Sequence, residues 1–363
     1  MNFTATRSTG KRVLAAAAIA SLTAIGLAAC SGSGSGSDKV GVSLIVKTTT
    51  NPYFVSMEDA AKADAAKAGV NLTLAAGKQD GDVATQVQAI ESAIGRGDKG
   101  ILITPNGPGV QNAIDKARKA GLYVIALDTV PTPPSSVDIT FATDNFAAGE
   151  AIGKWTAAQL NGKAADIAML DLFNTQVVSV DLNRDQGFLK GMGIAVPDSS
   201  KNGSEAKSGS YTGGTGGSYT IAGHQPTNGD AADGRTAMET ILAKDPNVNV
   251  VYTINEPAAY GAYQALQAAG KAKGTILVSI DGGCTGVSQV KSGIIGATSQ
   301  QYPSKMASLG MEAIVKLAKT GQKPKTTNGL DFYNTGSQLV TNTAVPGLKS
   351  ITPDAASSIC WGK

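Results

Sequence analysis

Short hydrophobic runs alternate with longer segments of helical periodicity along most of this chain. From residue 40, apolar runs such as VGVSLIV (40–46) are followed by Ala-rich segments such as 52–68, whose apolar residues recur every three to four positions. Most of these runs are continuously apolar, which is typical of parallel strands covered by helices on both faces. The pattern therefore predicts an α/β protein.

The expected strands are 40–46, 71–76, 100–104, 122–127, 166–170, 218–223, 248–254, 275–280 and 294–299. The expected helices are 52–68, 82–95, 109–120, 145–160, 179–194, 230–244, 257–269, 285–291 and 303–319. These are too many strands for one compact sheet, so we expect two doubly wound parallel-sheet lobes. The Gly/Ser-rich segment 199–218 is expected to be a mobile surface loop, because it precedes a strand and lacks the Lys-Ser/Thr of a phosphate-binding loop.

The N-terminus has the layout of an export signal. A basic start with Arg7, Lys11 and Arg12 is followed by an apolar stretch that ends in small residues at Cys30. The sequence Leu-Ala-Ala-Cys resembles the lipobox of bacterial lipoproteins, in which the Cys is lipidated; the alternative is a plain signal with a coincidental Cys. The Ser/Gly run 31–38 is then a flexible tether. We expect an exported protein, lipid-anchored to the outer face of the cell membrane or periplasmic.

Composition narrows the class further. Hydrophobic residues make up 42% and charged residues 16%, and the net charge of +3 is not concentrated in any Lys/Arg block, so we expect no nucleic-acid partner. One His and three Cys leave little material for a transition metal, and we expect no metal and no cofactor. After export, Cys284 and Cys360 favour one disulfide that pins the C-terminal tail; two free buried thiols are the alternative.

Polar and aromatic side chains follow most of the predicted strands, at the sheet edge where open α/β proteins bind ligands. They include Lys47, Asn51, Tyr53, Phe54, Asp128, Asn255, Asp281 and Gln301, with Arg184 near the start of a helix. Such groups suit a polyhydroxylated ligand, because carboxylates accept from hydroxyls while Lys and Arg donate to them. Helix capping by the Asp and Asn residues, and a core role for one aromatic, are the alternatives.

The charges of this set balance. Lys47 and Arg184 are positive, whereas Asp128 and Asp281 are negative. A desolvated site avoids unpaired charge, so the expected ligand is neutral. Glycoside hydrolysis by Asp128 and Asp281 is disfavoured, because neighbouring cations would keep both ionised and leave no general acid. The lone His224, read as a loop residue, has no nucleophile motif beside it.

Several motifs are similar to one family in the expected order over nearly all of 40–320. NPYFVSMEDAAKADAAKAGV, YVIALD, NRDQGF, VYTINEPAAYGAYQALQAAGK, SIDG and ATSQQYP resemble the periplasmic sugar-binding proteins of the ribose/galactose/fructose type, the solute receptors of ABC importers. NEPAAYGAY, VSIDGGC and GATSQQYP look most like the fructose-binding branch, whose C-terminal Cys is matched by Cys360. Three departures stand out. Lys47 corresponds to a Ser of the ribose receptor, and Thr129 replaces its Arg. Gly229 aligns near an aromatic of the second lobe, for which Phe173 or a neighbour is a candidate substitute.

The resemblance implies a type I periplasmic binding protein with a three-strand hinge. Its ligand contacts would be Lys47, Asn51, Tyr53, Phe54, Asp128, Arg184, Asn255, Asp281 and Gln301. The implied organisation is a signal peptide at 1–30, a tether at 31–38, lobe 1 at 39–142 plus 302–338, and lobe 2 at 143–301 plus 339–363. This arrangement places Cys284 and Cys360 in one lobe.

The implied function is capture of a neutral monosaccharide or sugar alcohol by hinge closure. The partner would be an ABC permease, and the receptor itself is expected to be a monomer and not an enzyme. A ketose, a pentose, a furanose and an acyclic polyol all stay open as ligands. A receptor for a membrane signalling kinase is the alternative function. A sugar-responsive repressor would need a helix-turn-helix where the export signal stands.

Overall fold

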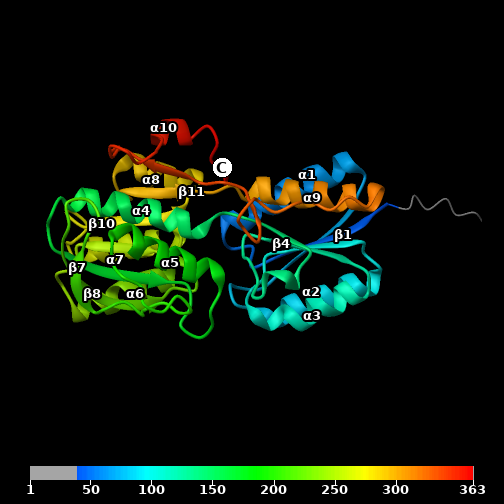
Figure 1. Cartoon of the computed structure of the whole chain (residues 1–363), viewed down its shortest axis with the longest axis horizontal. Helices are drawn as coiled ribbons and strands as arrows, with labels where there is room; N and C mark the ends of the chain where they lie inside the picture. Colours follow the sequence, from blue (N-terminus) through cyan, green and yellow to red (C-terminus); the bar gives the residue numbers. More distant parts are fainter. Residues whose placement is uncertain (1–38, 363) are drawn as a thin grey trace, which may run out of the picture. The chain divides into compact units, whose positions relative to one another are not determined.

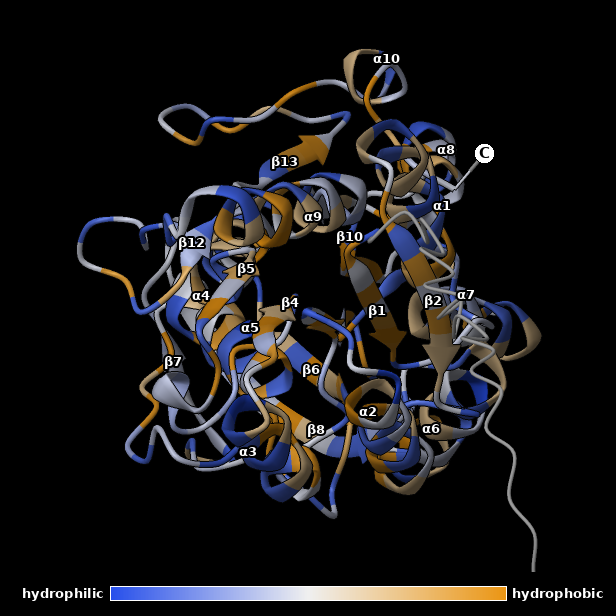
Figure 2. Cartoon of the chain, turned by 90° about the vertical axis from the view of Figure 1, so that its right-hand side faces the viewer, coloured by the Kyte–Doolittle hydropathy of each residue, from blue (hydrophilic) through white to orange (hydrophobic). Residues whose placement is uncertain are grey.

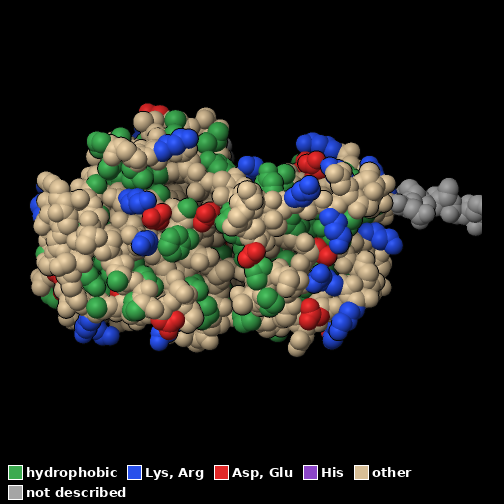
Figure 3. Space-filling model, viewed as in Figure 1, with side chains coloured by type: hydrophobic (Ala, Val, Ile, Leu, Met, Phe, Trp, Pro, Cys, Tyr) green, Lys and Arg blue, Asp and Glu red, His purple; other side chains and the backbone are tan. Residues whose placement is uncertain are grey.

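A computed structural model describes residues 39–362. The predicted signal peptide (1–30), the predicted lipidation site Cys30 and the predicted tether (31–38) lie outside the described residues. Within the described part, no helix combines the length and the apolar composition that a membrane span requires. The face of the molecule in Figure 3 has Lys and Arg interspersed with Asp and Glu.

The first lobe is built on a six-stranded parallel sheet in the order β12-β5-β4-β3-β1-β2. Its strands are β1 (Gly41–Val46), β2 (Asn71–Ala76), β3 (Gly100–Ile103), β4 (Tyr123–Leu127), β5 (Ile139–Ala142) and β12 (Tyr333–Asn334). Helices α1 (Pro52–Ala68) and α9 (Pro303–Thr320) cover one face, and α2 (Val83–Arg96) and α3 (Gln111–Lys119) cover the other (Figure 1). Two short 3₁₀ turns, Pro108–Val110 and Pro134–Ser136, precede α3 and β5.

The second lobe has a seven-stranded sheet in the order β13-β11-β10-β9-β6-β8-β7, in which the edge strands β13 and β7 run antiparallel to their neighbours. Its strands are β6 (Ala165–Asp171), β7 (Ser208–Tyr211), β8 (Gly217–Pro226), β9 (Val250–Thr253), β10 (Ile276–Asp281), β11 (Ala297–Gln300) and β13 (Gln338–Thr341). Its helices are α4 (Asn145–Leu160), α5 (Ser179–Met192), α6 (Ala231–Lys244), α7 (Glu256–Ala268), α8 (Cys284–Ser292) and α10 (Pro353–Ala356).

Burial of the central strands on both faces explains the continuous apolar runs. In β1, Val42, Leu44 and Val46 pack against α1 and α9, whereas Ile45 packs into the cluster under α2 and α3. Inner strands such as β1 are correspondingly hydrophobic, whereas the helices carry both hydrophilic and hydrophobic residues (Figure 2). The predicted fold class of two doubly wound lobes is therefore confirmed, with the addition of two antiparallel edge strands.

The chain passes between the two sheets three times. It leaves the first sheet after Ala142, returns to the first lobe after Gln300, and crosses again between Asn334 and Gln338. Three separate connections of this kind are the three-strand hinge that the resemblance implies.

Two expectations for the second lobe are wrong. Segment 199–218 is not simply a loop: β7 lies within it and pairs with β8, and buried Tyr211 donates a hydrogen bond to the carbonyl of Lys163. His224 lies in β8 and not in a loop. Both errors have one cause: β8 pairs with the distant strand β6, and β7 pairs as a short hairpin with β8, so pairing orders residues whose own composition predicts irregular structure.

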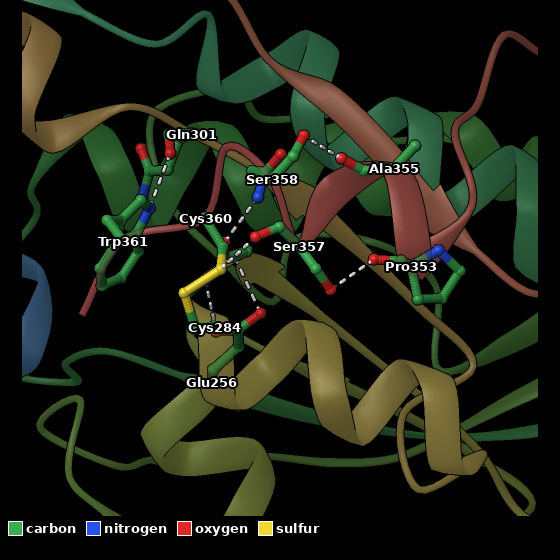
Figure 4. Close-up of a disulfide and its surroundings, with 12 residues drawn as sticks. Glu256, Cys284, Gln301, Pro353, Ala355, Ser357, Ser358, Cys360 and Trp361 are labelled. Carbon is green, nitrogen blue, oxygen red and sulfur yellow. Dashed lines mark hydrogen bonds between the residues drawn. A yellow bond between two sulfur atoms is a disulfide. The ribbon is translucent and has the colours of Figure 1, made fainter. Parts of the chain in front are cut away.

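The C-terminal tail is fixed beside the junction of the lobes. Cys284 and Cys360 form a disulfide, with 76 residues of sequence separation (Figure 4). The next residue, Trp361, donates its indole N–H to the carbonyl of Gln301 at 2.8 Å and packs edge-on against Tyr53 of α1 at 5.2 Å. The disulfide thus holds an aromatic ring from the end of the chain against the first lobe.

Replacement of both cysteines (Cys284→Ala with Cys360→Ala) is expected to lower the free energy of unfolding by about 2–4 kcal/mol, because the cross-link restricts a long loop in the unfolded chain. Thermal unfolding with and without reductant measures this. Reductant should destabilise the parent and leave the double variant unchanged, and equal melting temperatures for both proteins would contradict the prediction.

Candidate functional site

One cavity collects the residues that follow the carboxyl ends of strands in both lobes. Its lining consists of Lys47, Asn51, Tyr53, Phe54, Asp80, Asp128, Leu172, Val180, Arg184, Ile254, Asn255, Asp281 and Gln301. The list includes every residue that the resemblance implies as a ligand contact. It also includes Asp80, which the sequence reasoning missed.

In the first lobe the charged groups are tied to one another. The ammonium of Lys47 lies 3.5 Å from the carboxylate of Asp128 and 5.9 Å from the ring centre of Phe54. Asp128 also accepts hydrogen bonds from the hydroxyls of Tyr53 (3.0 Å) and Thr129 (2.9 Å). Lys47 and Asp128 are both almost completely buried, so the pairing is what makes their charges tolerable.

A second charged pair belongs to the second lobe. Arg184 lies 3.7 Å from a carboxylate oxygen of Asp281 and donates to the carbonyl of Ile254 (2.9 Å) and to the side chain of Asn145 (2.8 Å). Asp281 in turn accepts from the amide of Gln301 at 2.8 Å. These bonds leave the guanidinium in one orientation, facing the cavity.

Close helix packing fixes the position of Arg184. Helices α4 and α5 meet through Gly149 and Gly187, and a Cβ at either glycine would overlap the backbone of the opposite helix, at Arg184 and Phe146 respectively. Only glycine permits this approach. It brings Arg184 within reach of Asn145 at the start of α4.

The two aspartates share an unusual backbone. Asp128 has φ 67° and Asp281 has φ 147°, both in the region that L-residues rarely adopt. Such conformations cost on the order of 1–3 kcal/mol each and persist at positions where function demands them. Asp128 directly follows β4 and Asp281 is the last residue of β10, and the carboxylates of both line the cavity.

Part of the polar set has a structural role as well. The side-chain oxygens of Asn51 and Asn255 cap α1 and α7 by accepting from the backbone N–H groups of Tyr53 and Ala258. The amide of Asn255 also donates to the carbonyl of Gly229. The capping alternative is therefore correct for both oxygens, although both residues line the cavity.

Comparison with known proteins identifies the family. Residues 42–323 match the model of the periplasmic binding protein domain, which covers most of the chain. The chain belongs to this family. The ribose import binding protein RbsB of Haemophilus influenzae is 30% identical over 307 residues, which cover 84% of this chain and 94% of that protein. The galactofuranose-binding protein YtfQ of Escherichia coli is 27% identical over 273 residues, 73% of this chain and 78% of that protein.

Solved structures agree on the fold. An ABC transporter solute-binding protein from Agrobacterium vitis with bound D-fucose superposes with a TM-score of 0.71 at 23% identity, covering 88% of this chain and 100% of that chain. A solute-binding protein from Bacillus halodurans with bound myo-inositol gives 0.68 at 17% identity, with 88% and 96% covered. Membership of the family predicted from the motifs is thus confirmed, while the likeness to the fructose-binding branch stays a prediction.

Asp80 changes the charge balance of this periplasmic binding protein. It lies in the loop after β2, is 9% exposed, and its Oδ1 has no hydrogen-bond partner among the described residues. Burial raises the pKa of Asp80 to about 6, although Lys47 lowers it. The site therefore contains three carboxylates and two cations instead of the predicted two and two. Inspection of the residues after every predicted strand, including 71–76, would have found it.

Burial of neighbouring side chains also explains why a glycine stands at position 229. A Cβ on Gly229 would lie 2.9 Å from the amide nitrogen of Asn255, 3.0 Å from Asp80 and 3.2 Å from Leu172, so these three side chains fill the space around it. Phe173 does not line the cavity. Its ring lies against Gly81 beside a neighbouring hollow, whereas its neighbour Leu172 lines the cavity. The aromatic rings in the cavity, Tyr53 and Phe54, come from the first lobe alone.

Burial weakens the acidity of the second lobe's carboxylates too. It raises the pKa of Asp281 to about 6 despite the lowering effect of Arg184. Behind it, burial and the charge of Asp281 raise the pKa of Glu256 to about 8, although Glu256 accepts from Thr298 and from backbone N–H groups. Asp281 is still mostly ionised at neutral pH, but its pKa is closer to neutral pH than the sequence reasoning expected.

Asp80→Asn is expected to stabilise the ligand-free protein at pH 8 by roughly 1–3 kcal/mol. A carboxyl whose pKa is higher in the folded state than in the unfolded state destabilises the fold above the folded pKa, and this penalty fades as pH falls from about 6 to about 4. Denaturant unfolding at pH 8 and pH 5 measures the difference, which should shrink at the lower pH.

Asp82→Ala, two residues away, is the matched control, because it is expected to change the stability at pH 8 in the opposite direction. Asp82 caps α2, and hydrogen bonds from the backbone N–H groups of Lys78 and Thr85 lower its pKa, so this variant should be less stable at pH 8. If Asp80→Asn were less stable than the parent at pH 8, the ionised carboxylate of Asp80 would be stabilising the fold, and the prediction would be contradicted.

Proposed function

We propose that this chain is an extracytoplasmic solute-binding protein that captures a neutral monosaccharide or sugar alcohol and delivers it to an ABC import permease. The observation that carries the proposal is the cavity in which each lobe presents its own buried ion pair. Relatives named for ribose and galactofuranose support the same ligand class.

The chemistry of the cavity favours hydroxyl groups. Asp128 and Asp281 accept from neighbouring hydroxyls, while Lys47 and Arg184 donate to hydroxyl oxygens, with hydrogen bonds to charged groups worth about 1.5–3 kcal/mol each. An anionic ligand would add to an existing excess of carboxylates. A cationic ligand would offset that excess, but it would bring its charge close to Lys47 and Arg184, which already pair with Asp128 and Asp281. A hydroxyl that donates to the unpartnered Asp80 satisfies that carboxylate without adding charge.

The apolar side chains that line the cavity favour a ligand with little flat surface. A pyranose clamped between two rings needs an aromatic from each lobe, but the second lobe supplies Leu172, Val180 and Ile254. We therefore propose a furanose or an acyclic polyol before a pyranose. Tyr53 and Phe54 cover one side of its carbon skeleton.

Hinge closure is the proposed means of capture. The lobes touch outside the cavity as well: the side chain of Gln176 donates to the carbonyl of Asn106 at 3.1 Å, and Ser179 donates to the carbonyl of Val130 at 2.7 Å. A ligand that bonds to both lobes stabilises this closed arrangement over an open one, and a permease can distinguish the two.

We also propose the lipid anchor at Cys30, on the strength of the signal-like sequence before it and the Ser/Gly run after it. Cys30→Ser should move the protein from the membrane fraction to the soluble fraction of the producing cell, with folding and ligand binding unchanged. Detergent phase partition followed by immunoblotting measures this. Equal partition of both proteins would contradict the anchor.

A thermal-shift panel of neutral monosaccharides and alditols, with carboxylate and phosphate sugars as controls, tests the ligand class. The true ligand should raise the melting temperature, and the rise should keep growing with the logarithm of the ligand concentration once that concentration exceeds Kd. Asp128→Ala and Arg184→Ala should each weaken binding by 2–5 kcal/mol, because each leaves a buried charge without its partner. Asp59→Asn on the exposed side of α1 is the control. Unchanged affinity in both site variants would refute the assignment.

A further inference from the structure

A second polar cluster lies inside the second lobe, behind the ligand cavity. The imidazole of His224 in β8 stands between two carboxylates: its Nδ1 is 2.7 Å from Asp171 at the end of β6, and its Nε2 is 2.7 Å from Glu205 in the segment before β7. Asp185 of α5 adds a third carboxylate, 3.8 Å from Nδ1. Four segments that are distant in sequence thus place acidic or imidazole groups at one point.

The carboxylates of this cluster have unused oxygens. Asp185 is fully buried, and neither of its oxygens has a hydrogen-bond partner among the described residues. One oxygen each of Asp171 and Glu205 is also buried and unpartnered. A buried carboxylate without any donor is among the most costly groups in a fold. These oxygens therefore indicate that an electron-pair acceptor belongs in the cluster.

Neighbouring side chains do not supply that acceptor. Arg184 is adjacent in sequence to Asp185, but its guanidinium is bonded to Asn145 and Ile254 at the ligand cavity. Asp181, also on α5, is satisfied by the backbone N–H groups of Leu172 and Phe173 and adds further negative charge. Within the described part of the chain, His224 is the basic side chain that the three carboxylates share.

The geometry fits a metal ion. One ligand atom each from Asp171, Asp185 and His224 lies within 4.8 Å of the others. When Nε2 of His224 carries the proton and donates it to Glu205, Nδ1 presents its lone pair toward Asp171 and Asp185. A carboxylate that orients the far nitrogen is the usual support of a metal-bound histidine. Tetrahedral ligation at about 2.0–2.2 Å places ligand atoms roughly 3.3–3.6 Å apart, so the 2.7 Å Asp171–His224 contact has to widen by about 0.6–0.9 Å. The wider separations within the group, up to 4.8 Å, have to shorten.

We propose that Asp171, Asp185 and His224 bind a divalent transition-metal ion, Zn²⁺ in preference to Ca²⁺, with Glu205 as the residue that positions the imidazole. One nitrogen and two carboxylates with an open fourth position suit Zn²⁺, whereas Ca²⁺ takes six to eight oxygen ligands. The ion would join β6, α5 and β8 directly behind Leu172 and Arg184, which line the ligand cavity. This proposal replaces the expectation of no metal and does not depend on the nature of the solute.

Calorimetric titration of the chelator-stripped full chain with Zn²⁺, in the absence of any sugar, tests the site. We expect one equivalent of Zn²⁺ to bind and to raise the melting temperature more than Ca²⁺ does. Asp185→Asn and His224→Gln should each weaken Zn²⁺ binding at least 100-fold, and Glu205→Gln by about 10–100-fold. Asp198→Asn is the matched control. Asp198 lies in the segment before β7, as Glu205 does, but its side chain is largely exposed, so this variant should bind Zn²⁺ normally.

Circular dichroism of each variant establishes that it is folded, and Asp171→Asn replaces any variant that is not. The alternative occupant is a second proton on His224, which makes an imidazolium between Asp171 and Glu205. In that case Zn²⁺ would not bind, or would bind equally well to Asp185→Asn, and the proposal would be overturned. Stabilisation by Ca²⁺ that equals or exceeds that by Zn²⁺ would also contradict it.

Discussion

The pairing of buried charges within each lobe is the constraint on which the site depends. Lys47 is balanced by Asp128 in the first lobe, and Arg184 is balanced by Asp281 in the second. Neither pair crosses the cavity, so separation of the lobes leaves no buried charge without its partner. The contacts that favour closure then come from the ligand and from uncharged contacts between the lobes, such as the hydrogen bonds of Gln176 and Ser179. This is how a hinge can stay sensitive to a small uncharged molecule.

The fold holds these pairs in place with backbone conformations that are themselves unfavourable. Asp128 and Asp281 hold positive φ angles, and Gly149 and Gly187 allow the close approach of α4 and α5 that sets Arg184. On the other side of the junction, the disulfide at Cys360 keeps Trp361 against Tyr53. Elements from both ends of the chain therefore converge on a small number of oriented side chains.

The sequence predicted most helices and most inner strands well, because their signals are local, but it missed the short inner strand β5. The predicted helix at 145–160 matches α4, and 52–68 matches α1. Edge strands such as β7 were missed, since a Ser/Gly sequence becomes a strand only when β8 lies beside it. The polar set at the strand ends was found because the carboxyl ends of parallel strands must meet. Asp80 and the cluster at His224 were missed, because burial without a partner appears only once segments distant in sequence are brought together.

The affinity of the site for one carbon skeleton in three charge states tests the central claim most directly. Isothermal titration with the alditol or furanose that the protein binds, with its carboxylate analogue and with its amino analogue, isolates the charge of the ligand from its shape. The account predicts that the neutral compound binds at least about 100-fold more tightly than either charged analogue, a difference of about 2.7 kcal/mol. Tighter binding of the carboxylate or the amine would contradict it.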